Sequence, residues 1–182
     1  MKKSLRIPKV LHELFGEEQI KSELIITIGF GIASFLALIF CTQEEWVGLA
    51  WYKTALLFLF LLDILGGVAA NLSTGTNQYY LNHPKKRWVF IAIHVQPFVF
   101  AWILQSDLMA AFMVWAYTIG SSAIINLLQG KEYQRILAGS LLGFGILVFT
   151  LLSFDLPKVI TVIYMLYMFK LIYGFSVDHH KA

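Results

Sequence analysis

Two ionisable side chains, Asp63 and His94, stand inside runs of apolar residues and are the strongest candidates for chemistry in this sequence. Asp63 is preceded by TALLFLFLL and followed by ILGGV, and His94 follows WVFIAI. An ionisable group is costly to place in lipid, so such residues usually mark proton relays, ion paths or ligand contacts. We therefore predict that Asp63 and His94 form one proton- or ligand-binding unit.

Other polar residues fall at a similar predicted depth. Counted from the nearer end of each apolar run at about 1.5 Å per residue, Asp63 lies about 10 Å deep and His94 about 9 Å. By the same count Ser121, Ser122 and Lys170 lie about 8–10 Å deep. Four apolar runs thus place ionisable or hydroxyl groups in one layer, nearer to one membrane surface than to the other.

Helical spacing aligns these residues into stripes, and polar groups inside lipid favour partners within a helix bundle. We therefore expect each stripe to face inward. Pro97 removes a backbone donor and predicts a kink just beyond His94, whereas Gln96 should point away from His94. The stripes are Asp63–Gly67–Asn71, Thr118–Ser122–Asn126 and Tyr164–Tyr167–Lys170–Tyr173.

Each of these residues also has a structural interpretation. Asp63 could form an ion pair with Lys170 or His94 that only stabilises the bundle, and His94 could be a packed histidine. Lys170 could extend its ammonium group to the membrane surface. The candidate ligand- or proton-binding set contains Asp63, His94, Asn71, Ser121, Ser122, Asn126 and Lys170.

A metal site is the alternative for the histidines. Catalytic zinc takes about three protein ligands, and His83, His94, His179 and His180 could supply them. No fixed spacing such as HExxH ties these four together, and no sequence motif identifies a cofactor or a nucleic-acid partner.

The segment 71–87 is predicted to be the longest loop. It offers Asn77, Tyr79, Tyr80 and His83 as ligand contacts, and we interpret it as a lid over the Asp63–His94 layer. Its basic residues Lys85–Arg87 would contact anionic lipid headgroups.

The rest of the chain is a membrane frame. Of its 182 residues 58% are hydrophobic and only 14% are charged, which excludes an ordinary soluble domain. Six apolar segments approach the roughly 20 residues that cross a bilayer, so we expect one all-α domain of six transmembrane helices over residues 24–175. The segments are Leu24–Cys41, Leu49–Ala70, Trp88–Leu104, Leu108–Leu128, Ile136–Phe154 and Val159–Phe175.

Basic residues predict the orientation. With the N-terminus inside, eleven Lys and Arg residues lie on the inner side, and only Lys53 and Lys158 lie on the outer side. Both termini are then cytoplasmic, including the tail 176–182, and a plasma membrane is expected. The inner residues are Lys2, Lys3, Arg6, Lys9, Lys21, Lys85, Lys86, Arg87, Lys131, Arg135 and Lys181.

The first 23 residues precede the first apolar segment. Val10, Leu11, Leu14 and Phe15 have helical spacing, so a short amphipathic helix at the membrane surface is expected there. No cleavable signal is predicted, because the apolar run does not follow the basic start directly. A single cysteine, Cys41, excludes an internal disulfide.

Small residues predict close helix contacts. Gly29, Ala33 and Ala37 share one face of the first span, and Gly139 and Gly143 recur in the fifth. Packing within the chain is the simpler interpretation of both faces, and the first could instead dock a membrane-protein partner.

The functional prediction is a small membrane transporter or ligand-binding component for a small-molecule or lipid ligand. Its polar site lies in the cytoplasmic half and exchanges protons. Two alternatives remain open: a membrane-embedded enzyme for a lipid-like substrate, which could depend on zinc, and a substrate-binding subunit of a larger uptake complex.

Overall fold

In a computed structural model that describes residues 4–152 and 154–180, six helical spans are long and apolar enough to cross a membrane. Each coincides with a predicted apolar segment to within about one helical turn, so the prediction of six helices long and apolar enough to span a membrane is confirmed. The spans are α2 (Lys21–Cys41), α4 (Trp51–Ala70), α6 (Pro84–Ile93) with α7 (Gln96–Leu104), α8 (Leu108–Leu127), α9 (Gln134–Leu151), and α10 (Lys158–Met168) continued by η2 (Phe169–Phe175).

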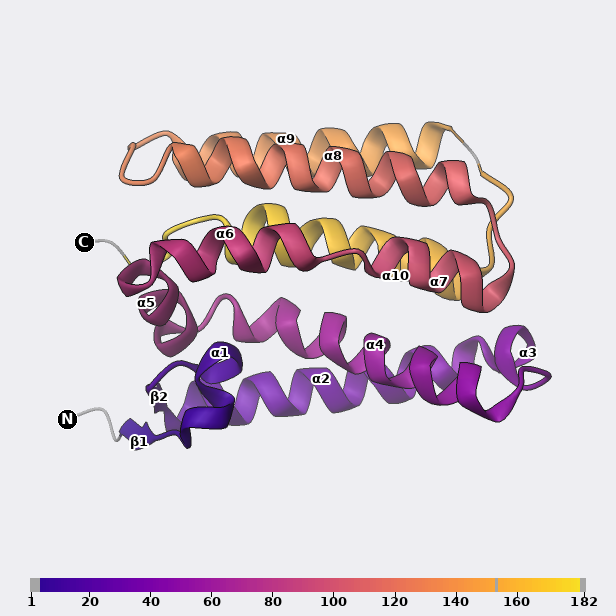
Figure 1. Ribbon diagram of the computed structural model, residues 1–182, viewed down its shortest axis with the longest axis horizontal. Coiled ribbons are helices and arrows are strands. Elements are labelled where there is room, and N and C mark those ends of the chain that lie inside the picture. The colour runs from indigo at the N-terminus through magenta and orange to yellow at the C-terminus, as the bar shows by residue number, and fades with distance from the viewer. Residues whose placement is uncertain (1–3, 153, 181–182) are drawn as a thin grey trace.

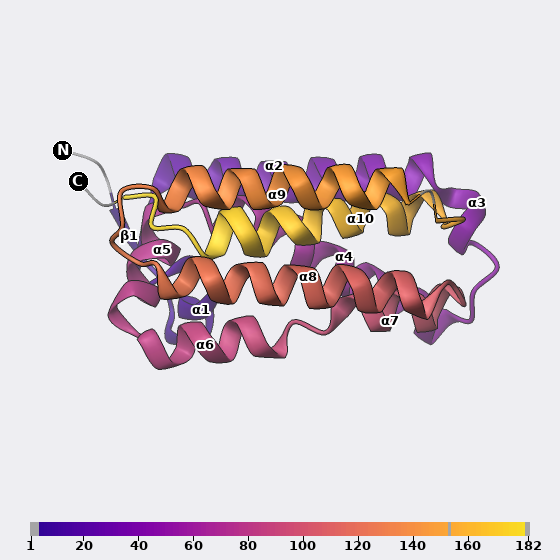
Figure 2. The same cartoon turned by 90° about the horizontal axis from the view of Figure 1, so that it is seen from above.

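The spans run side by side in three tiers (Figure 1). The pair α8 and α9 lies at the top, α6, α7 and α10 form the middle, and α4 and α2 lie below. Turning the molecule shows α10 flanked by α9 and α8 (Figure 2). The last span therefore occupies the centre, and Tyr164, Tyr167 and Lys170 on its predicted polar stripe are all buried.

The first and last described parts of the chain lie at the same end of the bundle (Figures 1 and 2). We call this the terminal end. A short hairpin of β1 (Ser4–Arg6) and β2 (Glu18–Ile20) lies there, which the sequence did not predict. Between the strands, η1 (Lys9–Leu11) and α1 (His12–Phe15) occupy the place of the expected amphipathic helix.

The predicted loop 71–87 is also largely helical. It contains α5 (Thr74–Asn82) and then the start of α6, with Pro84 in its first turn. Glu23, which is distant in sequence, caps the N-terminus of α5. Its carboxylate accepts hydrogen bonds from Thr74 N (2.8 Å) and Thr74 Oγ1 (2.8 Å). The loop is therefore an ordered element that is held by the N-terminal part of the chain.

Two other carboxylates cap helices at the end opposite the termini. Asp107 accepts from Met109 N and Ala110 N at the start of α8. Glu45, in the short helix α3 (Gln43–Trp46), accepts from Lys158 N (2.7 Å) and Val159 N (2.8 Å) at the start of α10. These four bonds satisfy helix donors that would otherwise lack partners.

The sequence predicted a kink near Pro97 in the third span. The structure instead shows a full break at His94 and Val95, which separates α6 from α7. Val95 N bonds to Ile93 O (2.9 Å), which replaces the donor that Pro97 lacks. His94 O loses its helical partner because Phe98 N bonds to Val95 O instead, and the hydroxyl of Tyr167 donates to it at 2.6 Å. The break is thus satisfied from the central span.

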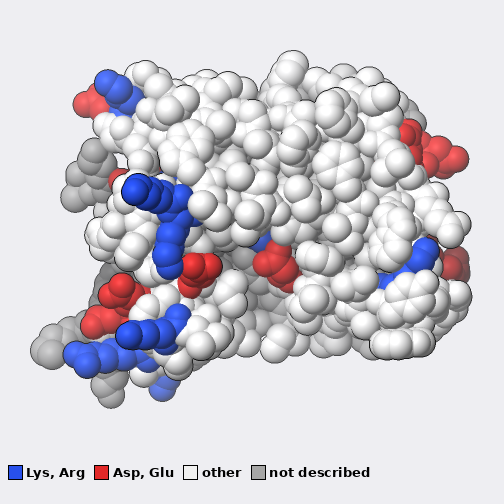
Figure 3. Space-filling view, viewed as in Figure 1, with Lys and Arg blue, Asp and Glu red and all other residues white. Residues whose placement is uncertain are grey.

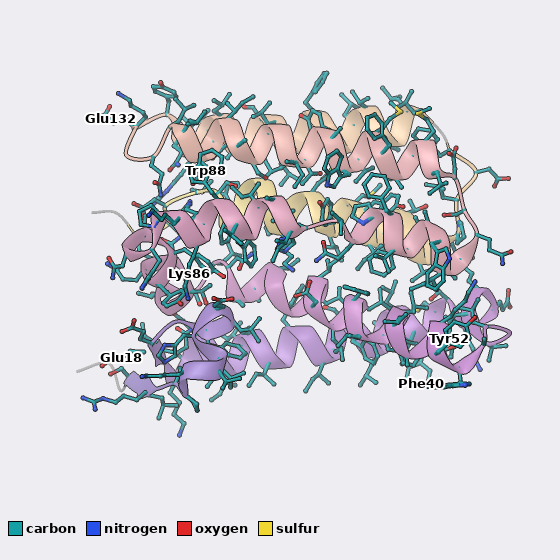
Figure 4. All side chains as sticks on the ribbon, in the orientation of Figure 1. Glu18, Phe40, Tyr52, Lys86, Trp88 and Glu132 are labelled. Atoms are coloured by element: carbon teal, nitrogen blue, oxygen red, sulfur yellow. The ribbon has the colours of Figure 1, made fainter. Side chains whose placement is uncertain are left out.

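Charged residues gather at the two ends of the molecule, with a broad apolar band between them (Figure 3). Glu18, Lys86 and Glu132 lie at the terminal end, whereas Phe40 and Tyr52 lie at the other (Figure 4). The band is interrupted near its middle by acidic and basic atoms in a hollow of this face (Figure 3).

Candidate functional site

An ion pair between Asp63 on α4 and Lys170 on η2 forms the centre of the candidate site. Lys170 Nζ lies 2.7 Å from Asp63 Oδ2. The lysine side chain is only 1% exposed, whereas 36% of the aspartate side chain is exposed. The cation is therefore enclosed by protein, and the carboxylate is the partner that a ligand can reach.

Lys170 packs against the predicted stripe Asp63–Gly67–Asn71. Asn71 Nδ2 donates to Lys170 O at 3.2 Å. At Gly67 a Cβ atom would lie 2.4 Å from Lys170 Cε, so only glycine leaves room for the lysine stem. All three residues of the stripe thus contact Lys170, Asp63 and Gly67 at its side chain and Asn71 at its backbone carbonyl. Lys170 itself lies in a π-helical segment, a departure from α-helix that often occurs at functional sites.

Gln96 belongs to the site, although the sequence did not predict it as a site residue. Its Nε2 donates to Asp63 Oδ2 at 3.1 Å. Spacing along a continuous helix predicted that Gln96 points away from His94, but the break at His94 and Val95 turns the next helix and brings Gln96 to Asp63. The proline three residues beyond a deep histidine was the signal that could have found it.

His94 makes no hydrogen bond to Asp63, and that the two form one proton- or ligand-binding unit stays a prediction. Its Nδ1 bonds to the carbonyl of Phe90, and its Nε2 has no partner among the described residues. The ring is 3% exposed. The partner of Asp63 is Lys170, the alternative that the sequence analysis left open.

A pocket of about 430 Å³ opens beside the ion pair. Its walls come mainly from α2 and α4, and four of its apolar side chains are exposed on the outside of the bundle: Ile28, Ile32, Leu59 and Leu62. Asp63, Lys170, Asn71 and Thr27 supply polar groups. Figure 3 shows the surface hollowed between the tier of α6 and the tier of α2 and α4. The pocket therefore opens sideways, toward the region that lipid would occupy.

The N-terminal segment closes the pocket toward the terminal end, because Glu13, Leu14 and Phe15 line it. The predicted lid residues of 71–87 instead hold this segment in place. Tyr80 OH donates to Glu13 O (3.2 Å), and Thr76 Oγ1 donates to Leu14 O (2.8 Å). The structure thus corrects the lid prediction, since the N-terminal segment lines the pocket and α5 supports it.

A glycine pair allows this close docking. Gly16 has φ +73°, a left-handed conformation, and a Cβ atom there would lie 2.1 Å from Gly75 O.

The remaining candidate lid residues also serve packing. Asn77 Nδ2 donates to Val177 O, Tyr79 packs against His83, and burial raises the pKa of Tyr80 above its ordinary value.

No family model matches this sequence, and no curated protein or solved structure matches it either. The site must therefore be interpreted from its own chemistry.

The candidate residues of α8 lie apart from the pocket. Ser121, Ser122 and Asn126 are buried with Thr118 on the inner face of the helix, and none of them lines the pocket at Asp63. The structure therefore does not bring the serines and Asn126 to the same ligand as Asp63.

The four histidines of the alternative metal set are not assembled. His83 bonds to Tyr79 O, His94 to Phe90 O, and His180 to Leu72 O. His179 bonds to Tyr173 O and Gly174 O. Over residues 4–152 and 154–180, no three His, Cys, Asp or Glu side chains are grouped to hold a metal ion. The zinc-enzyme alternative thus lacks its ligand set in this part of the chain.

The small-residue face of the first span does not pack within the chain as the simpler interpretation predicted. Gly29, Ala33 and Ala37 are exposed, and the contact of α2 with α4 instead runs through Gly31, whose Cβ would lie 3.4 Å from Gly66 Cα. The packing interpretation of the first face is wrong, and its use by a membrane-protein partner stays a prediction.

Proposed function

We propose that the protein is an integral membrane carrier or ligand-binding component that takes an amphiphilic ligand from the bilayer into the pocket beside Asp63 and Lys170. One observation carries this proposal: a partly exposed carboxylate, paired with a fully buried lysine, lies at the polar part of a pocket that opens sideways through apolar walls. Mostly apolar pockets with a few convergent polar groups are typical of small-molecule sites.

The polar groups favour a ligand whose head donates hydrogen bonds. Both bonds that described residues make to Asp63 go to Oδ2, so Oδ1 is free to accept from a ligand. The ammonium of Lys170 is already engaged by Asp63, and Glu13 adds a second carboxylate to the lining. An ammonium head bonded to Oδ1 would gain a charge-assisted hydrogen bond.

Proton exchange follows from the same geometry. Protonation of Asp63 removes the negative charge that holds both Lys170 and a cationic head. A ligand cation and a proton therefore compete for one carboxylate, which is the arrangement a proton-linked carrier needs.

We also propose that both termini face the cytoplasm and that the membrane is a plasma membrane. The support is the excess of basic residues that the sequence predicts on the inner side, one of which, Lys86, lies at the terminal end (Figure 4). The pocket is then closed on its cytoplasmic side by Glu13, Leu14 and Phe15.

The test is binding of three probes with equal chain length: dodecylamine, dodecanol and dodecanoic acid. Native mass spectrometry of the purified protein should show saturable binding of the amine at one site. The substitution Asp63→Asn should weaken this binding by about tenfold or more, because the charge-assisted bond is lost.

Asp107→Asn provides the matched control, since it makes the same chemical change at a helix N-cap, where Asn caps as well as Asp. It should leave amine binding unchanged. Equal binding of all three probes, or full amine binding by a folded Asp63→Asn protein, would overturn the proposal.

A further inference from the structure

Four buried polar atoms on α8 have no hydrogen-bond partner among the described residues: Trp115 Nε1 and, at a spacing of four residues, Thr118 Oγ1, Ser122 Oγ and Asn126 Oδ1. Thr118 and Ser122 are fully buried, and Asn126 is 6% exposed. A spacing of four residues places them on one face of the helix, over a length of about 12 Å at 1.5 Å per residue. They form a continuous polar line inside the bundle.

The third span carries a second such line. Arg87 is 1% exposed and uses only Nη2, which donates to Phe175 O and Ser176 O, so its Nε and Nη1 have no described partner. His94 Nε2 and Gln96 Oε1 are likewise buried without a partner in the described chain. We call these six residues the polar file: Arg87, His94, Gln96, Thr118, Ser122 and Asn126.

Two contacts show that the helices carrying these residues lie side by side. Near the middle of the membrane region, the rings of Phe98 and Trp115 lie 5.5 Å apart. At the terminal end, Ser176 O accepts from Arg87 Nη2 and from Gln134 Nε2, which also donates to Ile125 O at 3.0 Å. Because the two spans run in opposite directions, these contacts place Arg87 level with Asn126, and His94 level with Thr118.

Leaving such groups unpaired would be costly. A buried donor or acceptor without a partner costs about 1–3 kcal/mol, and buried polar groups in native proteins are nearly always bonded to protein or to ordered water. The polar file mixes guanidinium donors, amide acceptors, an imidazole and hydroxyls. Water can serve all of them, because it accepts from the guanidinium, donates to the amide oxygens, and does either with the imidazole and the hydroxyls.

We propose that the polar file binds a row of internal water molecules, leading from Arg87 and Asn126 at the terminal end to His94 and Gln96. Gln96 donates to Asp63, so the row ends one side chain from the ion pair. Its use as a proton route to Asp63 rests on the proposed function, whereas the bound water does not.

Hydroxyl-radical footprinting with short X-ray pulses tests the proposal, because radicals made from bound water modify the side chains next to it. The protein is placed in lipid nanodiscs, and oxidation of His94 is followed by mass spectrometry. Tyr164 is the control, since it is equally buried and its hydroxyl bonds to Pro97 O at 2.9 Å. We expect His94 to be oxidised several-fold faster than Tyr164.

The double variant Thr118→Val/Ser122→Ala removes two hydroxyls with little change of shape. We expect it to bring the oxidation rate of His94 close to that of Tyr164, and Ser122→Ala alone should show part of the effect if the double variant folds poorly. Equal rates for His94 and Tyr164 in the unmodified protein would overturn the hydrated file. A His94 rate unchanged in a folded double variant would overturn the route along α8.

Neither measurement uses a ligand, so failure of dodecylamine binding is a separate result.

Discussion

At the scale of single residues, the two members of the ion pair are not equivalent. Lys170 is enclosed, while Asp63 is partly exposed and keeps a second bond from Gln96. Removing one charge of a buried pair is most costly when the charge left behind is the one that is cut off from water.

We therefore expect Asp63→Asn to lower the free energy of unfolding by about 2–4 kcal/mol, since it leaves the Lys170 ammonium without its counter-charge. Lys170→Met should cost less, about 1–2 kcal/mol, because Asp63 retains Gln96 and solvent. Thermal unfolding in detergent of both single variants and of the double variant measures this. The double variant should cost less than the sum of the two, and strict additivity would argue against the pair.

The adjacent glycines Gly66 and Gly67 provide a second residue-scale prediction. A Cβ at Gly67 would lie 3.0 Å from Lys170 Nζ, whereas one at Gly66 would meet no described heavy atom within 4 Å. Gly67→Ala should displace the lysine and lower both the melting temperature and dodecylamine binding. Gly66→Ala is the control and should change neither. Equal behaviour of the two variants would show that the lysine stem lies elsewhere.

At the scale of elements, the close contact of α8 and α9 depends on Gly145. A Cβ there would lie 2.4 Å from Tyr117 Cε1, and the Tyr117 hydroxyl donates to Leu141 O at 2.6 Å. Gly143, which the small-residue pattern had singled out, is exposed and has no described neighbour within 4 Å of a Cβ. The spacing pattern thus marked the wrong face of α9.

Gly145→Ala should destabilise the protein by about 1–3 kcal/mol through overpacking. Gly143→Ala should be neutral or stabilising by up to about 1 kcal/mol, because alanine favours helix over glycine. Melting temperatures of the two variants in the same detergent test this prediction. A larger fall in melting temperature for Gly143→Ala than for Gly145→Ala would contradict the packing described.

The segment after η2 is a second element with a testable property. Burial lowers the pKa of His179, although its bonds to the carbonyls of Tyr173 and Gly174 oppose the shift. Because the folded pKa lies below the unfolded value of about 6.5, the unfolded chain binds the proton first. The stability contributed by neutral His179 is complete above about pH 6.5 and is lost as the pH falls through that value.

His179→Gln keeps a donor for the two carbonyls but does not titrate. Between about pH 7.5 and about pH 5.5, the melting temperature of the unmodified protein should fall further than that of this variant. Parallel melting curves across this range would show that His179 does not contribute.

At the scale of the whole molecule, the proposed orientation can be tested by cysteine labelling after Cys41, which is exposed, has been replaced by serine. The structure selects exposed positions: Gln43 and Gln105 at one end, and Asn82 and Glu132 at the terminal end. An impermeant maleimide added to intact cells should label cysteines at the first two positions only. The reverse pattern would place both termini outside and contradict the proposed orientation.

The sequence by itself determined the membrane frame. Six apolar runs of sufficient length predicted six spans, because hydrophobic length is a local property that each helix carries alone. It also identified Asp63, Gly67, Asn71 and Lys170 as residues facing inward, since helical spacing and the cost of polar groups in lipid act within one helix.

Only the tertiary structure decided which of these residues meet. The pairing of Asp63 with Lys170 instead of His94 depends on how two distant spans pack, and Gln96 enters the site because the third span breaks before it. The pocket walls and the docking of Gly16 on Gly75 likewise join segments far apart in the chain. Such contacts are set by the mutual fit of whole helices, which no local pattern of residues encodes.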